Sequence, residues 1–195
     1  MTSERTTTLT RRGLIAGGLG TGAALLLPTT AASAATLPYT FQTQETGSWC
    51  SAASTRIALT ARDVTPSQTT LANDLGLSGG AGLQDPTYIA AVLNAHLLRT
   101  DSANKYAFRM PKAGTLAETL YGHTRTSIDA GYPVVINMNQ VAGDTFSAGH
   151  YVAIVGYSTT QYQLADPFTS ARNGVWYAHA DVVAWNKLNR YTAFV

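Results

Sequence analysis

The chain has 195 residues, of which 45% are hydrophobic and 12% are charged, so it suits one domain and can bury a core. This balance argues against intrinsic disorder, which needs low hydrophobicity and high net charge. Without residues 1–34, ten basic and ten acidic side chains remain. The resulting zero net charge gives no general attraction for nucleic acid or an anionic membrane.

Residues 1–34 have the pattern of an export signal from a bacterial protein. The pair Arg11-Arg12 precedes an uncharged stretch, Gly13 to Leu27, which is shorter than the roughly 20 residues that a membrane-spanning helix needs. The small residues Ala32-Ser33-Ala34 predict cleavage after Ala34. The twin arginine favours the Tat route, with an ordinary Sec signal as the alternative. We therefore expect a secreted domain of residues 35–195 that keeps no stable membrane insertion.

From Ser48 to about Gly131, the mature chain has the pattern of helices. Thr65-Pro66 and Asp85-Pro86 each place a proline where a helix starts, and the apolar residues after Pro86 recur at helical spacing. Helices are expected over Cys50–Ala61, from Pro66 onward, from Pro86 to Leu97 and over Thr115–Ala130, with a flexible loop at Leu77–Leu83.

After Pro133 the pattern changes to short runs of β-branched and aromatic residues, which are typical of strands. Strands are expected at Val134–Met138, His150–Tyr157, Gln161–Asp166, Val175–Ala178 and Tyr191–Val195, with a short helix at Asp181–Leu188. A helical half followed by an antiparallel sheet half predicts an α+β fold.

Cys50 is the only cysteine of the chain. Exported proteins commonly pair their cysteines, so a single thiol is an accident, an intermolecular link or a reactive group. Cys50 starts a predicted helix, and a helix N-terminus favours a thiolate. Thiol acyl transfer also needs a base and donors for the oxyanion. His150 is the candidate base, and Gln44 is the candidate side-chain donor beside the backbone amide of Cys50.

The register of one expected hairpin supplies a candidate partner for His150. If the strands that begin at His150 and Gln161 pair across Ser158-Thr159-Thr160, Asp166 lies opposite Val152 and on the same face as His150. A loop one residue shorter would place the two side chains on opposite faces. Asp166 is therefore expected to hold the imidazole in one tautomer.

Three segments carry a resemblance to a known family: Gln44–Ser54, Gly149–Tyr157 and Leu164–Phe168. In residues and order they resemble a papain-like cysteine peptidase, and more narrowly the bacterial group around the double-glycine leader peptidases, family thirty-nine of the cysteine peptidases. Segment Ser127–Ile136 fits that group too, so the resemblance covers most of residues 42–168.

The resemblance implies a papain-like, two-lobed fold with the active-site cleft between the helical and sheet halves. It implies that Cys50 is the nucleophile, His150 the base, Asp166 the orienting carboxylate and Gln44 the oxyanion donor. The chain departs from the family at Ser51-Ala52, where Gly-Pro is common. Leader-processing members are joined to a transporter, whereas a stand-alone secreted form is expected here.

Together these observations predict a secreted thiol hydrolase that cleaves peptide bonds through an acyl-enzyme. Two alternatives stay open: an acyltransferase that uses the same triad, and a non-catalytic module that binds peptides or cell-wall fragments. We expect a peptide or protein substrate and a monomer. No cofactor or metal is expected, because His96, His123 and His179 form no pair at metal-ligand spacing.

Overall fold

The computed structural model describes residues 34–77, 80–98 and 106–194. The helices in these ranges are α1 (Cys50–Thr60), α2 (Gln68–Asp74), α3 (Thr87–Leu97), α4 (Leu116–Asp129) and α5 (His179–Trp185), with 3-10 turns η1 (Ala113–Thr115) and η2 (Ser170–Arg172). The strands are β1 (Ala35–Thr36), β2 (Tyr106–Arg109), β3 (Val134–Val141), β4 (Asp144–Tyr157), β5 (Gln161–Ala165), β6 (Asn173–Ala178) and β7 (Asn186–Phe194). Most of the expected export signal, and Val195, lie outside the described residues.

The strands form one sheet in the order β2-β7-β3-β4-β5-β6, with β1 paired to β4. All of these pairings are antiparallel, so the predicted α+β fold is confirmed. β2 is a correction, since the sequence pattern placed only helices before Gly131. Its four residues are too few to show a clear alternation.

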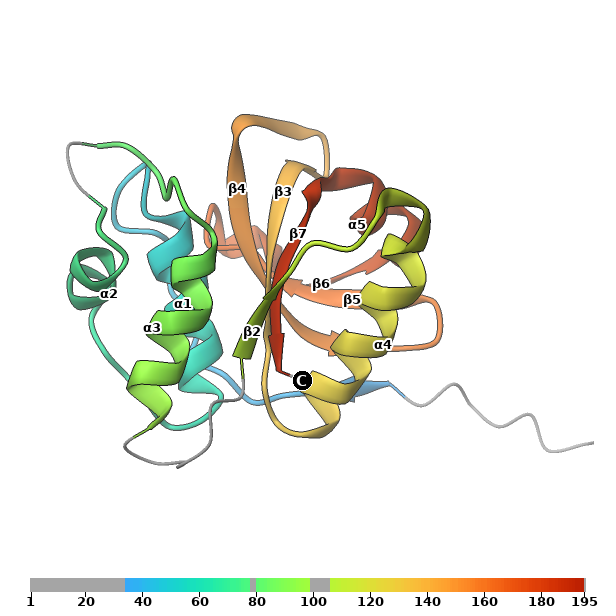
Figure 1. Cartoon of the computed structure of the whole chain (residues 1–195), viewed down its shortest axis with the longest axis horizontal. Coiled ribbons are helices and arrows are strands. Elements are labelled where there is room, and N and C mark those ends of the chain that lie inside the picture. The colour runs from blue at the N-terminus through green and yellow to red at the C-terminus, as the bar shows by residue number, and fades with distance from the viewer. Residues whose placement is uncertain (1–33, 78–79, 99–105, 195) are drawn as a thin grey trace, which may run out of the picture. The chain divides into compact units, whose positions relative to one another are not determined.

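Helices cover both faces of this sheet (Figure 1). Val134 and Ile136 of β3 pack with residues of α4 and α5, whereas Val135 packs with residues of α1, α2 and α3. Helix α4 comes from the helical N-terminal half of the chain, as predicted, but it packs on the opposite face of the sheet from α1, α2 and α3. The physical reason is that β3 is apolar on both sides, and a strand of this kind must be covered twice.

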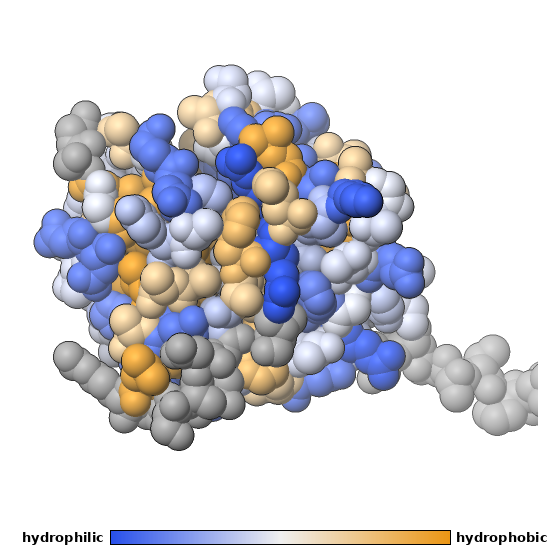
Figure 2. Space-filling view, in the orientation of Figure 1, coloured by the Kyte–Doolittle hydropathy of each residue, from blue (hydrophilic) through white to orange (hydrophobic). Residues whose placement is uncertain are grey.

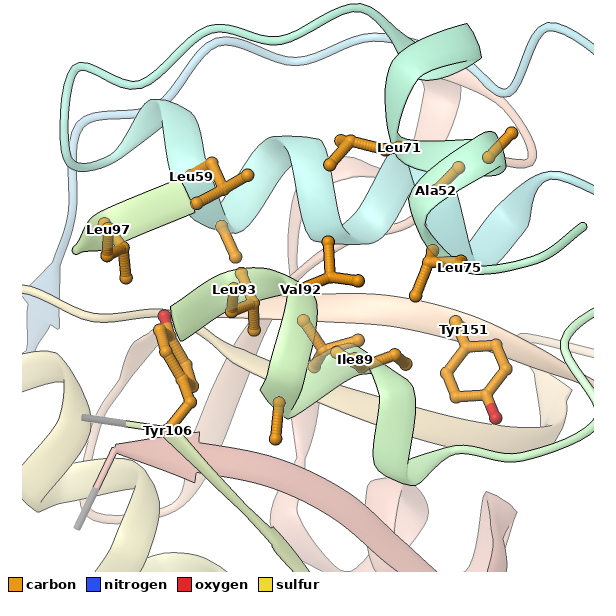
Figure 3. Packing of buried hydrophobic residues seen from close by; sticks show 14 of the residues in the cluster. Ala52, Leu59, Leu71, Leu75, Ile89, Val92, Leu93, Leu97, Tyr106 and Tyr151 are labelled. Atoms are coloured by element: carbon orange, nitrogen blue, oxygen red, sulfur yellow. The ribbon is translucent and has the colours of Figure 1, made fainter. Parts of the chain in front are cut away.

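Helix α1 lies at the centre of the helical layer, and ten of its eleven residues are buried. Figure 3 shows its residues Ala52 and Leu59 pointing toward side chains of α2, α3 and the sheet. The other labelled members of this cluster are Leu71, Leu75, Ile89, Val92, Leu93, Leu97, Tyr106 and Tyr151. Each large apolar side chain buried in this way stabilises the fold by about 1.5–3 kcal/mol, so the helix that begins at Cys50 is held firmly.

Strand β4 starts earlier than the sequence pattern indicates. Ala142 and Gly143, with φ of 49° and 97°, form a two-residue turn between β3 and β4. Positive φ at both central residues is the geometry of a type I′ hairpin, but alanine is an unusual residue there. The segment Ser147–Gly149, which precedes the strand expected from His150, is therefore part of β4.

Two helix boundaries also differ from the prediction. Helix α2 begins after Ser67, whose side chain accepts a hydrogen bond from the backbone of Thr70, so this serine caps the helix in preference to the preceding proline. Helix α5 ends at Trp185, and Asn186–Leu188 belong to β7. A shift in register against β3 interrupts β7 there, which hides the strand pattern.

The hairpin of β4 and β5 has the predicted register at the end away from the turn, close to His150 and Asp166. Ala153 pairs with Ala165, as expected, whereas Tyr157 pairs with Tyr162, one residue out of step. A bulge between Ile154 and Gly156 absorbs the difference. A slip of one residue would move the side chains of β5 to the other face of the sheet. The bulge cancels the slip, so Asp166 lies on the same face as His150.

The surface carries hydrophobic and hydrophilic residues side by side on the face seen in Figure 2. The large hydrophobic residues that the structure shows exposed are Tyr88, Leu98, Met110, Phe168 and Leu188. Scattered apolar residues of this kind are normal on a protein surface. Within the described ranges, no helix has the length and apolar character that crossing a bilayer demands.

Candidate active site

Cys50 is the first residue of α1 and is 8% exposed. One turn further along the helix, the Ser54 hydroxyl donates a hydrogen bond to the carbonyl of Tyr151, at 2.8 Å. Tyr151 follows His150 directly in β4. This buried hydrogen bond therefore connects the helix that carries the thiol to the strand that carries the imidazole, a contribution that the sequence pattern did not reveal.

A second bulge in β4 shapes the surroundings of His150. Met138 pairs with His150 and Gln140 with Thr145, so four residues of β4 lie opposite one residue of β3. The extra length places the Phe146 ring against the imidazole, with centroids 4.2 Å apart and planes within 20°. Bulges commonly redirect side chains near active sites in this way. His150 is left only 2% exposed.

Asp166 follows β5 and is fully buried. Its Oδ1 lies 2.6 Å from Nε2 of His150 and accepts a hydrogen bond of 2.9 Å from the backbone N–H of Phe168. Its Oδ2 accepts a hydrogen bond of 3.3 Å from Nη1 of Arg172. Burial by itself raises the pKa of Asp166, but these contacts outweigh it, and the pKa is lowered below its ordinary value.

The imidazole of His150 lies between this carboxylate and the thiol of Cys50. Burial lowers the pKa of His150, but hydrogen bonds and charge interactions with Asp166 and Cys50 outweigh it and raise the pKa to about 9. Because Asp166 occupies Nε2, Nδ1 is the ring nitrogen left for the thiol. Sulfur, imidazole and carboxylate thus form a connected series in which a proton can pass from Cys50 to His150.

Gln44 lies near the same residues but its side chain has another partner. Its backbone N–H donates to the carbonyl of Pro167 at 2.8 Å, which places the Gln44 segment beside Asp166. Its side-chain Nε2 donates to the carbonyl of Thr46, also at 2.8 Å. An amide nitrogen carries two hydrogens, so this contact uses only one of the two donors of Gln44.

A small cavity of about 70 Å³ adjoins Cys50. Its lining consists of Gly82, Leu83, Gln84, Asn137, Ala148, Gly149 and Tyr151. Gln84 also lines two larger hollows, of about 250 and 280 Å³, so these hollows adjoin the cavity beside the thiol. A still larger hollow of about 580 Å³ lies between α2 and α3, but it contains none of the residues described above.

The other three histidines lie apart from this group and have partners of their own. His96 contacts Asp74 at 2.8 Å, His123 contacts the Tyr191 hydroxyl at 2.9 Å, and His179 packs against the ring of Tyr162. Among the described residues, no group of three or more His, Cys, Asp or Glu side chains is arranged to hold a metal ion.

The structure thus brings three of the four predicted site residues into one connected group and places the fourth beside it. It adds Ser54, Phe146 and Arg172, which sequence reasoning missed. Only Ser54 left a signal, since it lies in a quoted motif at helical spacing from Cys50. Phe146 and Arg172 reach the site through a bulge and a 3-10 turn, and neither feature has a strong sequence pattern.

Comparisons with known proteins give the family and the fold of the chain. The model of the Peptidase_C39 like family matches residues 36–194. A crystal structure of a C39-like peptidase from Bacillus anthracis is similar at 16% identity with a TM-score of 0.60, covering 84% of this chain and 98% of that one. No curated protein matches the sequence significantly.

Two further crystal structures share the fold. A double glycine motif protease from an AMS/PCAT transporter, in complex with the leader peptide, is 13% identical with a TM-score of 0.54 over 82% of this chain and 93% of that one. The peptidase domain of Streptococcus ComA, a bifunctional ABC transporter of a quorum-sensing pathway, is 15% identical with a TM-score of 0.52 over 80% and 96%.

Proposed function

Because the chain belongs to the Peptidase_C39 like family and is a cysteine peptidase-like enzyme, we propose that it is an exported thiol hydrolase that cleaves peptide bonds through Cys50, His150 and Asp166. The observation that carries this proposal is the buried imidazole of His150, which interacts with the thiol on one side and with a carboxylate 2.6 Å away on the other. A nucleophile, a base and a group that orients the base are the parts that acyl transfer needs.

In the proposed reaction, His150 accepts the thiol proton and the sulfur of Cys50 attacks the carbonyl carbon of the peptide bond. The oxyanion that forms is stabilised by the backbone N–H of Cys50 and by the second side-chain amide hydrogen of Gln44. The imidazolium then donates its proton to the leaving amine, the C–N bond breaks and a thioester remains. Water, deprotonated by His150, attacks the thioester, releases the acid and regenerates the thiol.

The cavity beside Cys50 and the hollows that adjoin it support a peptide substrate. Gly82, Ala148 and Gly149 line the small cavity there, and such small residues let a substrate backbone approach the thiol. The similar double glycine motif protease is seen in complex with a leader peptide, which supports the binding of an extended peptide in the same fold. We propose that the enzyme acts on a peptide or protein as a monomer.

The proposal includes export and removal of residues 1–34. Cleavage after Ala34 makes Ala35 the first mature residue, and Ala35 is also the first residue of β1, where it pairs with Tyr157 of β4. Mass spectrometry of the secreted protein should show Ala35 as its N-terminus. Replacement of Arg11-Arg12 by two lysines should stop export if the route is Tat, whereas continued export would support the Sec alternative.

The hydrolase proposal is tested by Cys50→Ala. The wild type and the variant are incubated with a peptide library, and new termini are identified by mass spectrometry. We expect cleavage by the wild type only, with the same thermal unfolding for both proteins. Ser51→Ala is a matched control, because its buried hydroxyl has no hydrogen-bond partner among the described residues. A Cys50→Ala variant that still cleaves peptides would disprove the proposal.

Analysis of the products separates hydrolysis from the alternatives. A hydrolase yields the free acid even when an amine such as glycine methyl ester is added, whereas an acyltransferase yields the amide adduct. A binding module yields neither product, and its Cys50 would resist iodoacetamide under native conditions. We expect rapid alkylation of Cys50 together with free-acid products.

A further inference from the structure

We propose that Arg172 is a positioning residue that holds the carboxylate of Asp166 in place for His150. This inference rests on the proposed function, because it assigns a role within the same group of residues. It concerns a residue outside the series Cys50, His150 and Asp166, and one that no sequence motif indicated.

The guanidinium of Arg172 bridges two carboxylates. Its Nη1 donates to Oδ2 of Asp166 at 3.3 Å, and its Nη2 donates to Oδ2 of Asp144 at 2.5 Å. The backbone strengthens the connection, since the N–H of Asp166 donates to the carbonyl of Arg172 at 3.2 Å. The side chains of Arg172 and Asp166 are 14% and 0% exposed, so water screens their contact weakly. Asp144 is 52% exposed, so its contact with Arg172 is screened more.

The two oxygens of Asp166 have different tasks. Oδ1 accepts from the backbone of Phe168 and contacts His150, while the side-chain contact to Oδ2 comes from Arg172. A carboxylate fixed at one oxygen can still turn about its Cβ–Cγ bond. Nη1 of the planar guanidinium holds the second oxygen with a single hydrogen bond, while Nη2 is held by Asp144. Arg172 therefore restricts the plane of the carboxylate and the direction from which it meets the imidazole.

The bridge also joins two segments that lie on either side of His150. Asp144 begins β4, two residues before Phe146, whose ring stacks on the imidazole. Arg172 ends the turn η2. The charged groups that act directly on His150 are Asp166 and Cys50. By sign alone, the more distant Arg172 cation disfavours protonated His150 and the Asp144 anion favours it.

Other groups around the bridge have identified positions. Tyr177 of β6 is close enough to Arg172 and Asp166 for a charge interaction. Lys187 of β7 donates to the carbonyl of Ser147 at 2.6 Å, on the same side of the site as Gly149. Arg172 also lies over the ring of Phe168, 5.9 Å from its centroid, and that ring meets the imidazole of His150 edge to face. Asp144→Asn leaves this contact in place, so the effect of that variant on His150 comes from the bridge itself.

The test compares Arg172→Ala, Arg172→Lys, Arg172→Gln and Asp144→Asn with Arg125→Gln, a control in an exposed ion pair at 3.7 Å. Two rates are measured: peptide cleavage, and alkylation of Cys50 by iodoacetamide as a function of pH. We expect Arg172→Ala to lower kcat about 10- to 100-fold with KM within about twofold, because a misplaced catalytic group costs this much. Arg172→Lys should recover part of the loss.

The charge effect gives a second readout that a purely structural role would not produce. The alkaline limb of the alkylation profile should move up by about 0.5 pH unit in Arg172→Gln. In Asp144→Asn it should move down by a smaller amount, because Asp144 is 52% exposed and water screens its charge. Shifts in the same direction, or a wild-type kcat in Arg172→Ala, would overturn the proposal. So would a loss of activity that merely follows the unfolded fraction. The alkylation assay needs no substrate, so this result is separate from failure of the hydrolase proposal.

Discussion

Replacement of Asp166 by Asn separates the two contributions of this carboxylate to His150. Asparagine keeps an oxygen that accepts a hydrogen bond from Nε2 but removes the negative charge. In the native site the pKa of His150 is about 9, although burial by itself lowers it. Once the charge is removed, we expect the pKa of His150 to fall to its ordinary value or below.

The size of the effect follows from the fraction of protonated imidazole. At pH 8, a pKa of about 9 leaves about nine-tenths of the imidazole protonated, whereas an ordinary pKa of roughly 6.5 leaves about 3%. If the thiolate–imidazolium pair is the reactive form, Asp166→Asn should lower kcat/KM about 30-fold at pH 8. At pH 6 most of the imidazole is protonated in both proteins, so the loss there should be only a few-fold.

The assay is the pH profile of kcat/KM between pH 5 and 10, with the alkylation rate of Cys50 as a parallel measurement. Asp166→Ala serves as a matched variant, because it removes both the charge and the hydrogen bond and should lose activity at every pH. An alkaline limb in Asp166→Asn that coincides with that of the wild type would refute the reasoning.

Three further predictions concern stability. The raised pKa of His150 stabilises the folded state, and this contribution is complete below about pH 6.5. The lowered pKa of Asp166 also stabilises the folded state, and its contribution is complete above about pH 4. The free energy of unfolding, measured by urea denaturation, should therefore fall by about 3 kcal/mol between pH 6.5 and 9.5, where His150 loses its proton. Gly149→Ala should lower the melting temperature and abolish cleavage. The φ of residue 149 is 97°, which alanine adopts only under strain, and the new Cβ would lie 2.8 Å from the side-chain oxygen of Asn137. Ser54→Ala should cost about 1–3 kcal/mol in unfolding free energy, since it leaves the buried carbonyl of Tyr151 without its side-chain donor.

Each of these predictions has a control. The fall in stability above pH 6.5 should be much smaller in Asp166→Asn; an equal fall would mean that other groups cause it. Gly143→Ala also has a positive φ, of 97°, but nothing lies within 4 Å of its added Cβ, so it should be stable relative to Gly149→Ala. If the two variants have the same melting temperature, the contact of the new Cβ with the neighbouring side chain does not affect stability. Ser51→Ala removes a buried hydroxyl that has no hydrogen-bond partner among the described residues; a loss of stability equal to that of Ser54→Ala would exclude the hydrogen bond as the cause.

The pairing of His150 with Asp166 was predicted from the register of a regular hairpin, and that register explains the pairing only in part. The expected register is present at Ala153 and Ala165, but the turn is out of step and the bulge near Val155 corrects it. Alternation of side chains along a strand is a local property, so it can be read from sequence. A bulge depends on pairing with a neighbouring strand, and no local pattern reveals it.

Helix α4 gives the same lesson for the fold. Its boundaries were predicted to within one residue, because proline, glycine and helical spacing act locally. Its place on the opposite face of the sheet from α1 was not predicted. That placement depends on which side of β3 remains uncovered, and this is settled only when the whole sheet has formed.

The amino-acid sequence alone determined the class of fold, most helix boundaries and the residue types needed for thiol chemistry, since each depends on spacing within a short segment. Tertiary structure decided which side chains meet. It bent β4 so that Phe146 covers His150, placed the guanidinium of Arg172 behind Asp166, and turned one donor of Gln44 toward Thr46. These contacts join residues far apart in the chain, and they exist only because packing the core brings the segments together.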